Sequence, residues 1–325
     1  MRKSCQGVFA GGGVRGIGHV GAVLATEEAG YCFKNVEVSS AGAIVAALLA
    51  AGYSTEELHR VMQDTDYRKM KQGSWLSRLG MPGKAALLLY RFGIYRADYF
   101  EAWMAELLLR KKIKTFGDLP SDGKEPFCCL QLTATDLLTR RLLILPQDFA
   151  LFGLNPMSYP IAKAVRMSMS IPFFYAPYPL RDADGRLHYL VDGGVVSNYP
   201  IWLLDPEERA QKMPTFGYRF YSPKERQCPE CRTNANFAIY ARAVVAATLD
   251  GYDNHAARSG DADDRQSIWI STKIRQKDQE REISATDFEI TKEEGAALFE
   301  NGYRAGKDFF DLRRGRDGKR ETVAK

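Results

Sequence analysis

Three short motifs place residues that could carry out ester chemistry beside predicted strands. A glycine loop, Gly11-Gly12-Gly13-Val14-Arg15-Gly16, follows the apolar segment 6–10. Val38-Ser39-Ser40-Ala41-Gly42 lies where a β-branched segment meets a run of small residues, and Asp192-Gly193-Gly194 follows the apolar segment 187–191. Glycines let an anion approach backbone N–H groups, a serine hydroxyl can act as a nucleophile, and a carboxylate can accept its proton.

The glycine loop by itself is compatible with two chemistries. Its N–H groups could bind a dinucleotide pyrophosphate through Gly11, Gly13 and Gly16, with Glu37 placed where a ribose-binding carboxylate is expected. The same groups could instead form an oxyanion hole for an ester carbonyl. A tight turn without any ligand is the third interpretation.

Ser40 favours the ester chemistry, because a serine at a sharp strand–turn–helix junction projects its hydroxyl away from the sheet. Gly42, two residues later, fits a nucleophile elbow of the x-x-Ser-x-Gly kind. The simpler alternative is that Ser40 only caps the following helix, since serine is a common N-cap residue.

A nucleophilic serine needs a base, and no histidine has a recognisable triad context. The histidines are His19, His59, His188 and His255. Asp192 is therefore the better candidate, at a strand end where active sites of α/β proteins form, although aspartate is also common in glycine-rich turns. A carboxylate is a weak base for a serine hydroxyl, so backbone N–H groups must supply much of the stabilisation.

The elements that must position these residues alternate between strands and helices. This alternation predicts an α/β fold with a largely parallel sheet. Ser54 and Glu57 form a capping-box pattern, as do Thr291 and Glu294. The expected strands cover 6–10, 34–39, 126–134, 140–145, 187–191, 214–220 and 267–272. The expected helices cover 17–29, 41–51, 235–252 and 291 to about 310.

Composition excludes several classes of protein. The chain has 325 residues, 45% hydrophobic residues and a formal net charge of +5, which excludes global disorder and gives no reason to expect nucleic acid. The few cysteines favour a reducing compartment. Neither a signal peptide nor a membrane span is predicted. Cys228 and Cys231 resemble half of a zinc ribbon, but no second pair follows at a suitable spacing, so no metal is expected.

Taken together, the motifs resemble those of the patatin-like phospholipases, most closely the small bacterial members related to the neuropathy-target-esterase group. The resemblance rests on the glycine loop, Ser40-Ala41-Gly42-Ala43, the 164–172 segment, and Val191-Asp192-Gly193-Gly194 with Asn198-Tyr199-Pro200. It implies a three-layer α/β/α fold with a mainly parallel central sheet. We expect one domain over residues 1–312, with a motif-bearing core at about 7–200, completion by 201–312, and a basic flexible tail at 313–325.

The resemblance also implies roles for individual residues. Ser40 would be the nucleophile and Asp192 the base, in the turn completed by Gly193 and Gly194. The oxyanion hole would come from the amides of the glycine loop, namely Gly11, Gly12, Gly13, Val14, Arg15 and Gly16. Arg15 would either hold the loop or contact a phosphate. The implied substrate is a phospholipid or another lipid ester, and neither a metal nor an organic cofactor is implied.

Val38 departs from the family pattern, which has glycine at the first position of the elbow. A branched side chain there crowds a tight turn. Either the surrounding packing accepts Val38 and leaves the elbow intact, or the turn relaxes and Ser40 is misplaced. We expect a competent but slow hydrolase, with a non-catalytic lipid-binding protein as the alternative.

Residues 67–97 combine basic side chains with tryptophan, leucine and phenylalanine and contain no acidic residue. This composition suits contact with anionic lipid, and the glycines and proline within it fit a mobile lid. Packing against the core is the alternative. The cysteines and the missing signal peptide predict a cytoplasmic protein. Residues 67–97 add the expectation that it contacts the inner face of a membrane peripherally.

Overall fold

The structure is a computed structural model. It describes residues 2–40, 42–71, 73, 75–120, 129–203, 213–221, 244, 247, 266–276 and 279–323; within these ranges the side chains of Trp75, Arg78, Met81 and 315–323 are not described.

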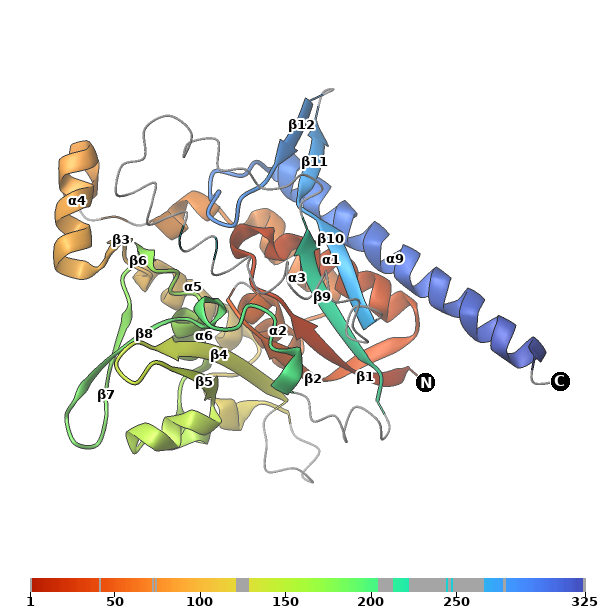
Figure 1. Ribbon diagram of the computed structural model, residues 1–325, viewed down its shortest axis with the longest axis horizontal. Coiled ribbons are helices and arrows are strands. Elements are labelled where there is room, and N and C mark those ends of the chain that lie inside the picture. Colours follow the sequence, from red (N-terminus) through yellow and green to blue (C-terminus); the bar gives the residue numbers. More distant parts are fainter. Residues whose placement is uncertain are drawn as a thin grey trace.

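Among the described residues, eight strands form a central sheet that is mixed and mostly parallel (Figure 1). The neighbouring pairs from β10 through β9, β1 and β2 to β4 are all parallel, whereas β5, β8 and β7 join in antiparallel pairs. The predicted α/β class is therefore confirmed. The sheet strands are β1 (Lys3–Phe9), β2 (Tyr31–Val38), β4 (Leu130–Asp136), β5 (Arg141–Leu145), β7 (Tyr178–Arg181), β8 (Leu187–Asp192), β9 (Thr215–Tyr221) and β10 (Ser267–Ser271). Two small sheets pair β3 (Gly93–Tyr95) with β6 (Phe173–Tyr175) and β11 (Lys273–Gln276) with β12 (Gln279–Glu282).

The helices are α1 (Gly16–Glu28), α2 (Gly42–Ala50), α3 (Thr55–Asp64), α4 (Gly80–Arg91), α5 (Asp98–Arg110), α6 (Ile161–Ser168) and α9 (Lys292–Val323). Helices α1 and α2 follow the predicted segments 17–29 and 41–51 closely, whereas α6 was not predicted. The capping box at Ser54 and Glu57 is present in full at the start of α3. Short 3-10 helices include η1 (Gly13–Arg15), η2 (Tyr67–Lys71), η3 (Trp75–Leu79) and η5 (Gln147–Phe152). The predicted helix 235–252 lies outside the described residues, except for positions 244 and 247.

The core lies on both faces of β1, because successive side chains of a strand point to opposite faces. Phe9 belongs to the large hydrophobic cluster that also contains the buried residues of α1 and α2. Val8 and Ala10 belong to a separate cluster with Tyr199 and Ile201. The large cluster is the one that supports the segments after β1 and β2.

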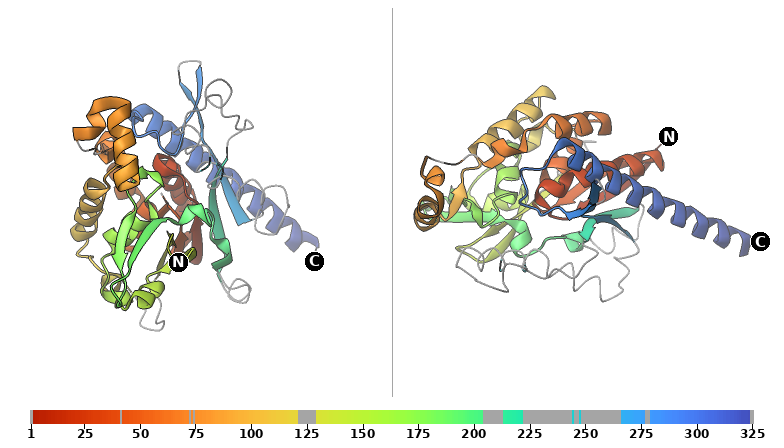
Figure 2. Two further views of the ribbon diagram at one scale, coloured as in Figure 1. Left: turned by 60° about the vertical axis from the view of Figure 1, so that its left-hand side comes forward. Right: turned by 90° about the horizontal axis from the view of Figure 1, so that it is seen from above.

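Helix α9 continues beyond the predicted end near residue 310. Its backbone stays helical to Val323, so it includes most of the segment predicted to be a flexible tail, and it projects past the rest of the fold (Figures 1 and 2). Arginine, lysine and glutamate are good helix formers, and Asp311 pairs with Arg314 one turn later. The domain boundaries proposed from the sequence remain a prediction.

Residues 67–97 form η2, η3, α4 and β3, with α4 lying away from the central sheet in each view (Figures 1 and 2). Part of the segment packs inward, since Met70 and Leu87 are buried. Other apolar side chains face outward, including Leu89 at 77% and Tyr90 at 86% exposure. Packing against the core therefore applies to part of the segment, and the contact with lipid remains a prediction. None of the described helices is long and apolar enough to span a membrane.

Candidate active site

Ser40 occupies a sharp turn between β2 and α2. Its φ angle of 53° lies in the left-handed region that side chains other than glycine rarely adopt. Such strain is characteristic of functional turns. Gly42 allows the close approach that this turn requires, because a Cβ atom there would lie 2.8 Å from Cβ of Phe9. Ala41 lies outside the described residues.

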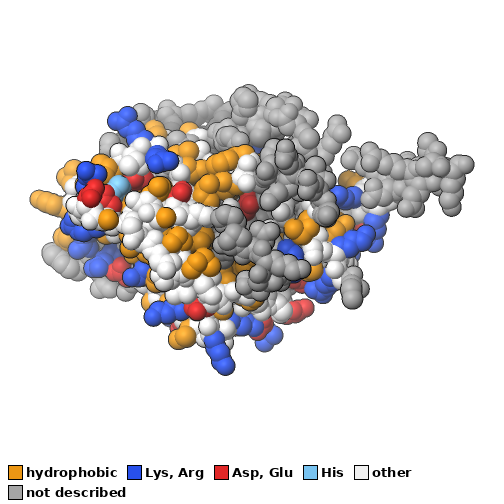
Figure 3. Space-filling view, turned by 90° about the horizontal axis from the view of Figure 1, so that it is seen from below, with side chains coloured by type: hydrophobic (Ala, Val, Ile, Leu, Met, Phe, Trp, Pro, Cys, Tyr) orange, Lys and Arg blue, Asp and Glu red, His pale blue; other side chains and the backbone are white. Residues whose placement is uncertain are grey.

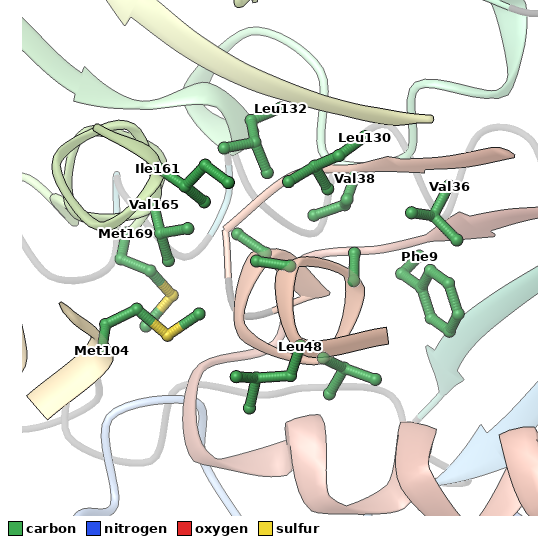
Figure 4. Packing of buried hydrophobic residues seen from close by; sticks show 14 of the residues in the cluster. Phe9, Val36, Val38, Leu48, Met104, Leu130, Leu132, Ile161, Val165 and Met169 are labelled. Carbon is green, nitrogen blue, oxygen red and sulfur yellow. The ribbon is translucent and has the colours of Figure 1, made fainter. Parts of the chain in front are cut away.

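Val38 does not prevent this geometry. Its side chain is fully buried and lies beside Leu130 on the α2 side of the sheet (Figure 4). The buried alanines of α2 belong to the same cluster. The relaxed turn, which was the second outcome considered for Val38, is not what the structure shows.

Strand register brings Ser40 level with Asp192. Val38 pairs with Leu132 of β4, and Asp192 pairs with Ala134 of the same strand. Both pairings lie on the edge of β4 opposite β5, because β5 pairs with Leu132 and Ala134 on the other edge. Ser40 lies as far beyond Val38 as Ala134 lies beyond Leu132, so Ser40 and Asp192 come to the same height on the same edge of β4. β8 runs antiparallel to β4 and therefore to β2, so the C-terminal ends of β8 and β2 meet and Asp192 lies at the carboxyl edge beside Ser40.

The two side chains form a direct hydrogen bond. Ser40 Oγ donates to Asp192 Oδ2 at 2.5 Å, and the N–H of Gly194 donates to Asp192 Oδ1 at 2.7 Å. Gly193 must lack a side chain, because its Cβ would lie 2.2 Å from Oγ1 of Thr133. Asp192 is therefore held on both oxygens and oriented toward the hydroxyl.

Burial changes the acidity of this carboxyl group. It raises the pKa of Asp192 to about 7, although the hydrogen bonds from Ser40 and Gly194 act in the opposite direction. A carboxylate with such a pKa is a stronger base than an exposed aspartate, and it is matched to proton transfer near neutral pH.

Only part of the glycine loop has N–H groups available for an oxyanion. Gly11 donates to the carbonyl of Asn198, and Val14 donates to the carbonyl of Ala285, each at 3.0 Å. Arg15 and Gly16 donate within the loop itself. Among the described residues, Gly12 and Gly13 have no acceptor for their N–H groups. Of the six amides predicted to form the oxyanion hole, those of Gly12 and Gly13 therefore remain as candidates.

Arg15 holds the loop. Its Nε donates to the carbonyl of Gly12 at 3.0 Å, and the guanidinium lies 5.3 Å from the ring centre of Phe220. In a trans peptide the C=O of one residue and the N–H of the next point in opposite directions. By anchoring the Gly12 carbonyl, Arg15 therefore also orients the Gly13 N–H.

Sequence reasoning assigned no role to the 164–172 segment, which contacts both members of the pair. Ser168 Oγ accepts the Ser40 N–H at 3.1 Å, and the Ser170 carbonyl accepts the Asp192 N–H at 3.0 Å. The signal in the sequence that could have indicated this role is the presence of two small polar residues, Ser168 and Ser170, in the motif. Its geometry depends on tertiary contacts between segments far apart in the chain.

Asn198 belongs to one of the motifs on which the resemblance rests, but it was assigned no role from the sequence. Its Oδ1 lies 2.1 Å from where a Gly11 Cβ would be, and Cβ of Ser40 lies 2.9 Å from the same point. Because Gly11 has no side chain, space is left beside Ser40, and the Asn198 side chain fills it.

None of the described histidines hydrogen-bonds to Ser40. His19 is buried between Phe9 and Phe220, and burial lowers its pKa to about 3. His188 bonds to Asp136 and Asp182, and His59 stacks on Phe299. His255 lies outside the described residues, as do Cys228 and Cys231. The described part of the chain also contains no group of three or more residues suited to hold a metal ion.

The chain is similar to known proteins in sequence. Residues 7–205 match the family described as patatin-like phospholipase. The chain is 36% identical to the uncharacterized protein YqhO of Bacillus subtilis, over 92% of this chain and 95% of that one. It is also 29% identical to an uncharacterized NTE family protein of Mycobacterium tuberculosis, over 58% of this chain and 42% of that protein.

Two solved structures are similar to this chain in fold. VipD from Legionella pneumophila superposes with a TM-score of 0.50 at 17% identity, covering 96% of this chain and 67% of that one. The ExoU–SpcU complex of Pseudomonas aeruginosa contains a chain with a TM-score of 0.50 at 18% identity, covering 96% of this chain and 52% of that one. The dinucleotide alternative is overturned by the family match, and it leaves the contact between Ser40 and Asp192 unexplained.

Proposed function

Because the chain belongs to the patatin-like phospholipase family, we propose that it is a lipid acyl hydrolase with a Ser40–Asp192 dyad. The observation that carries this proposal is the 2.5 Å hydrogen bond between Ser40 Oγ and Asp192 Oδ2. The substrate class is an ester of a lipid, such as a phospholipid or lysophospholipid.

The chemistry follows from the positions of these groups. Asp192 in its carboxylate form accepts the Ser40 proton while Oγ attacks the ester carbonyl carbon. The negative charge that develops on the carbonyl oxygen is stabilised by the N–H groups of Gly12 and Gly13. Asp192 then returns its proton to the departing alcohol, which leaves an acyl group on Ser40. Water, deprotonated by Asp192, attacks this acyl ester, and Ser40 regains a proton as the carboxylic acid departs.

A fluorophosphonate probe tests whether the nucleophile is reactive. We expect labelling of the native protein, none in Ser40→Ala, and a strong reduction in Asp192→Asn. Ser158→Ala, an exposed serine outside the site, is the matched control and should label normally. Absence of labelling in the native protein would instead favour the alternative function, a lipid-binding protein without activity.

We also propose that residues 67–97 contact an anionic membrane surface. Arg91 is exposed beside the outward-facing Leu89, Tyr90 and Phe92, a combination suited to a charged lipid interface. Exposed apolar side chains alone are weak support, since hydrophobic groups also gather on the face in Figure 3. The proposal depends on their combination with basic residues. The reducing compartment expected from the cysteines makes the cytoplasmic face of a membrane the expected side.

Vesicle flotation measures this contact. Binding should be stronger with anionic than with neutral vesicles, should weaken with salt, and should be lost in Leu89→Asp. Leu109→Asp is the matched control, because Leu109 on α5 is 66% exposed. Equal loss in both variants, or equal binding to both vesicle types, would contradict the proposed contact.

A further inference from the structure

An apolar pocket adjoins the glycine loop at Gly13, Val14 and Gly16. It is lined by loop residues together with side chains from several helices and segments. The lining includes Gly13, Ile44, Met62, Tyr67, Met70, Met169 and Phe288. The only polar side-chain group in this lining is the tyrosine hydroxyl, so a charged or strongly polar ligand would lose its hydration there without compensation.

Three features connect this pocket to the site described above. Gly13 belongs to it and supplies one of the two available N–H groups. Ile44 lies four residues after Ser40, which places it about one helical turn beyond the nucleophile. Met169 directly follows Ser168, whose hydroxyl accepts the Ser40 N–H. A chain attached to a carbonyl at Ser40 would therefore begin close to this pocket.

The side chains of the lining nearly fill the pocket. Its free volume is about 20 Å³, roughly the room needed by a single water molecule. Two segments form its outer wall: η2, whose Met70 carbonyl accepts a hydrogen bond from the Tyr175 hydroxyl, and the segment around Phe288, anchored through the Ala285 carbonyl. An ion pair between Lys71 and Glu289 joins the two segments.

The lining is nevertheless adaptable. Met62, Met70 and Met169 have long, unbranched side chains that change rotamer easily. Phe288 is buried and stacks on Phe174, which lies outside the pocket lining. Movement of these side chains can enlarge the pocket without disturbing the sheet.

We propose that this pocket binds the acyl chain of the substrate, and that Met70 and Phe288 limit the chain length it accepts. The inference rests on the proposed hydrolase function and adds the residues that select the acyl group. The occupant is an unbranched hydrocarbon chain, because the wall is apolar and the pocket begins beside the group that would bind the ester carbonyl.

A series of p-nitrophenyl esters from acetate to palmitate tests the assignment. Phe288→Ala should raise kcat/KM for decanoate relative to acetate by roughly tenfold, because the pocket lengthens. Ile44→Phe, which fills the pocket near its inner end, should lower the same ratio by a similar factor. Phe149→Ala removes an equally buried phenylalanine that does not line the pocket, and it should leave the ratio unchanged. Unchanged ratios in both pocket variants, with thermal unfolding confirming that they are folded, would overturn the assignment.

A binding measurement separates this inference from the proposed function. Ser40→Ala should bind a fluorescent long-chain fatty acid, and adding Ile44→Phe should weaken that binding by roughly tenfold. If the native protein hydrolyses no ester but this binding difference is found, the hydrolase proposal fails and the pocket assignment stands. Binding that is insensitive to Ile44→Phe would overturn the assignment even if the enzyme is active.

Discussion

At the scale of single residues, the buried carboxyl group of Asp192 controls the predicted pH dependence. Asp192 acts as a base only when it is deprotonated, and burial raises its pKa to about 7. We therefore expect kcat/KM to fall as the pH drops through this value, by about tenfold per pH unit at lower pH. The residual activity of Asp192→Asn should lack this inflection. A flat profile between about pH 5 and 8 would contradict the assignment of Asp192 as the base.

Ser168 is expected to act as a positioning residue. In Ser168→Ala the buried N–H of Ser40 loses its acceptor, so the strained turn is less firmly held. We expect kcat to fall roughly 10- to 100-fold with little change in KM. Ser170→Ala is the matched control, because the Ser170 hydroxyl bonds to the carbonyl of Arg166 and its link to Asp192 is through the backbone. Equal effects of the two substitutions on kcat would argue for a general packing role.

At the scale of elements, the contact between α1 and α9 is unusually close. A Cβ atom on Gly302 would lie 1.8 Å from the carbonyl oxygen of Gly18. Gly302→Ala should therefore force the helices apart and lower the free energy of unfolding by about 1–3 kcal/mol. Gly295→Ala, in the same helix, meets its nearest atom at 3.4 Å and should stabilise the protein by up to about 1 kcal/mol. Denaturant unfolding measures both changes, and the same sign for both would refute this account.

At the scale of the whole molecule, the C-terminal third completes the sheet. The family match ends at residue 205, yet β9 pairs with β1 inside the sheet and β10 pairs with β9. A chain truncated after residue 205 would expose an edge of β1, so we expect no cooperative unfolding transition. Truncation after Arg314 leaves β9, β10 and the contact between α9 and α1 in place and should preserve the transition. A cooperative transition in the shorter chain would show that the core folds alone.

The sequence by itself determined the chemical groups, because nucleophile, base and glycine loop are local patterns of residue type and spacing. It also determined the positions of most strands and helices near the site, because hydrophobic periodicity and capping are local properties. Only the tertiary structure decided which N–H groups of the glycine loop are available and that Val38 is accommodated. It alone showed that Ser168 and Asn198 belong to the site and that Asp192 arrives on an antiparallel strand. These facts depend on register and on contacts between segments far apart in the chain, which no local pattern encodes.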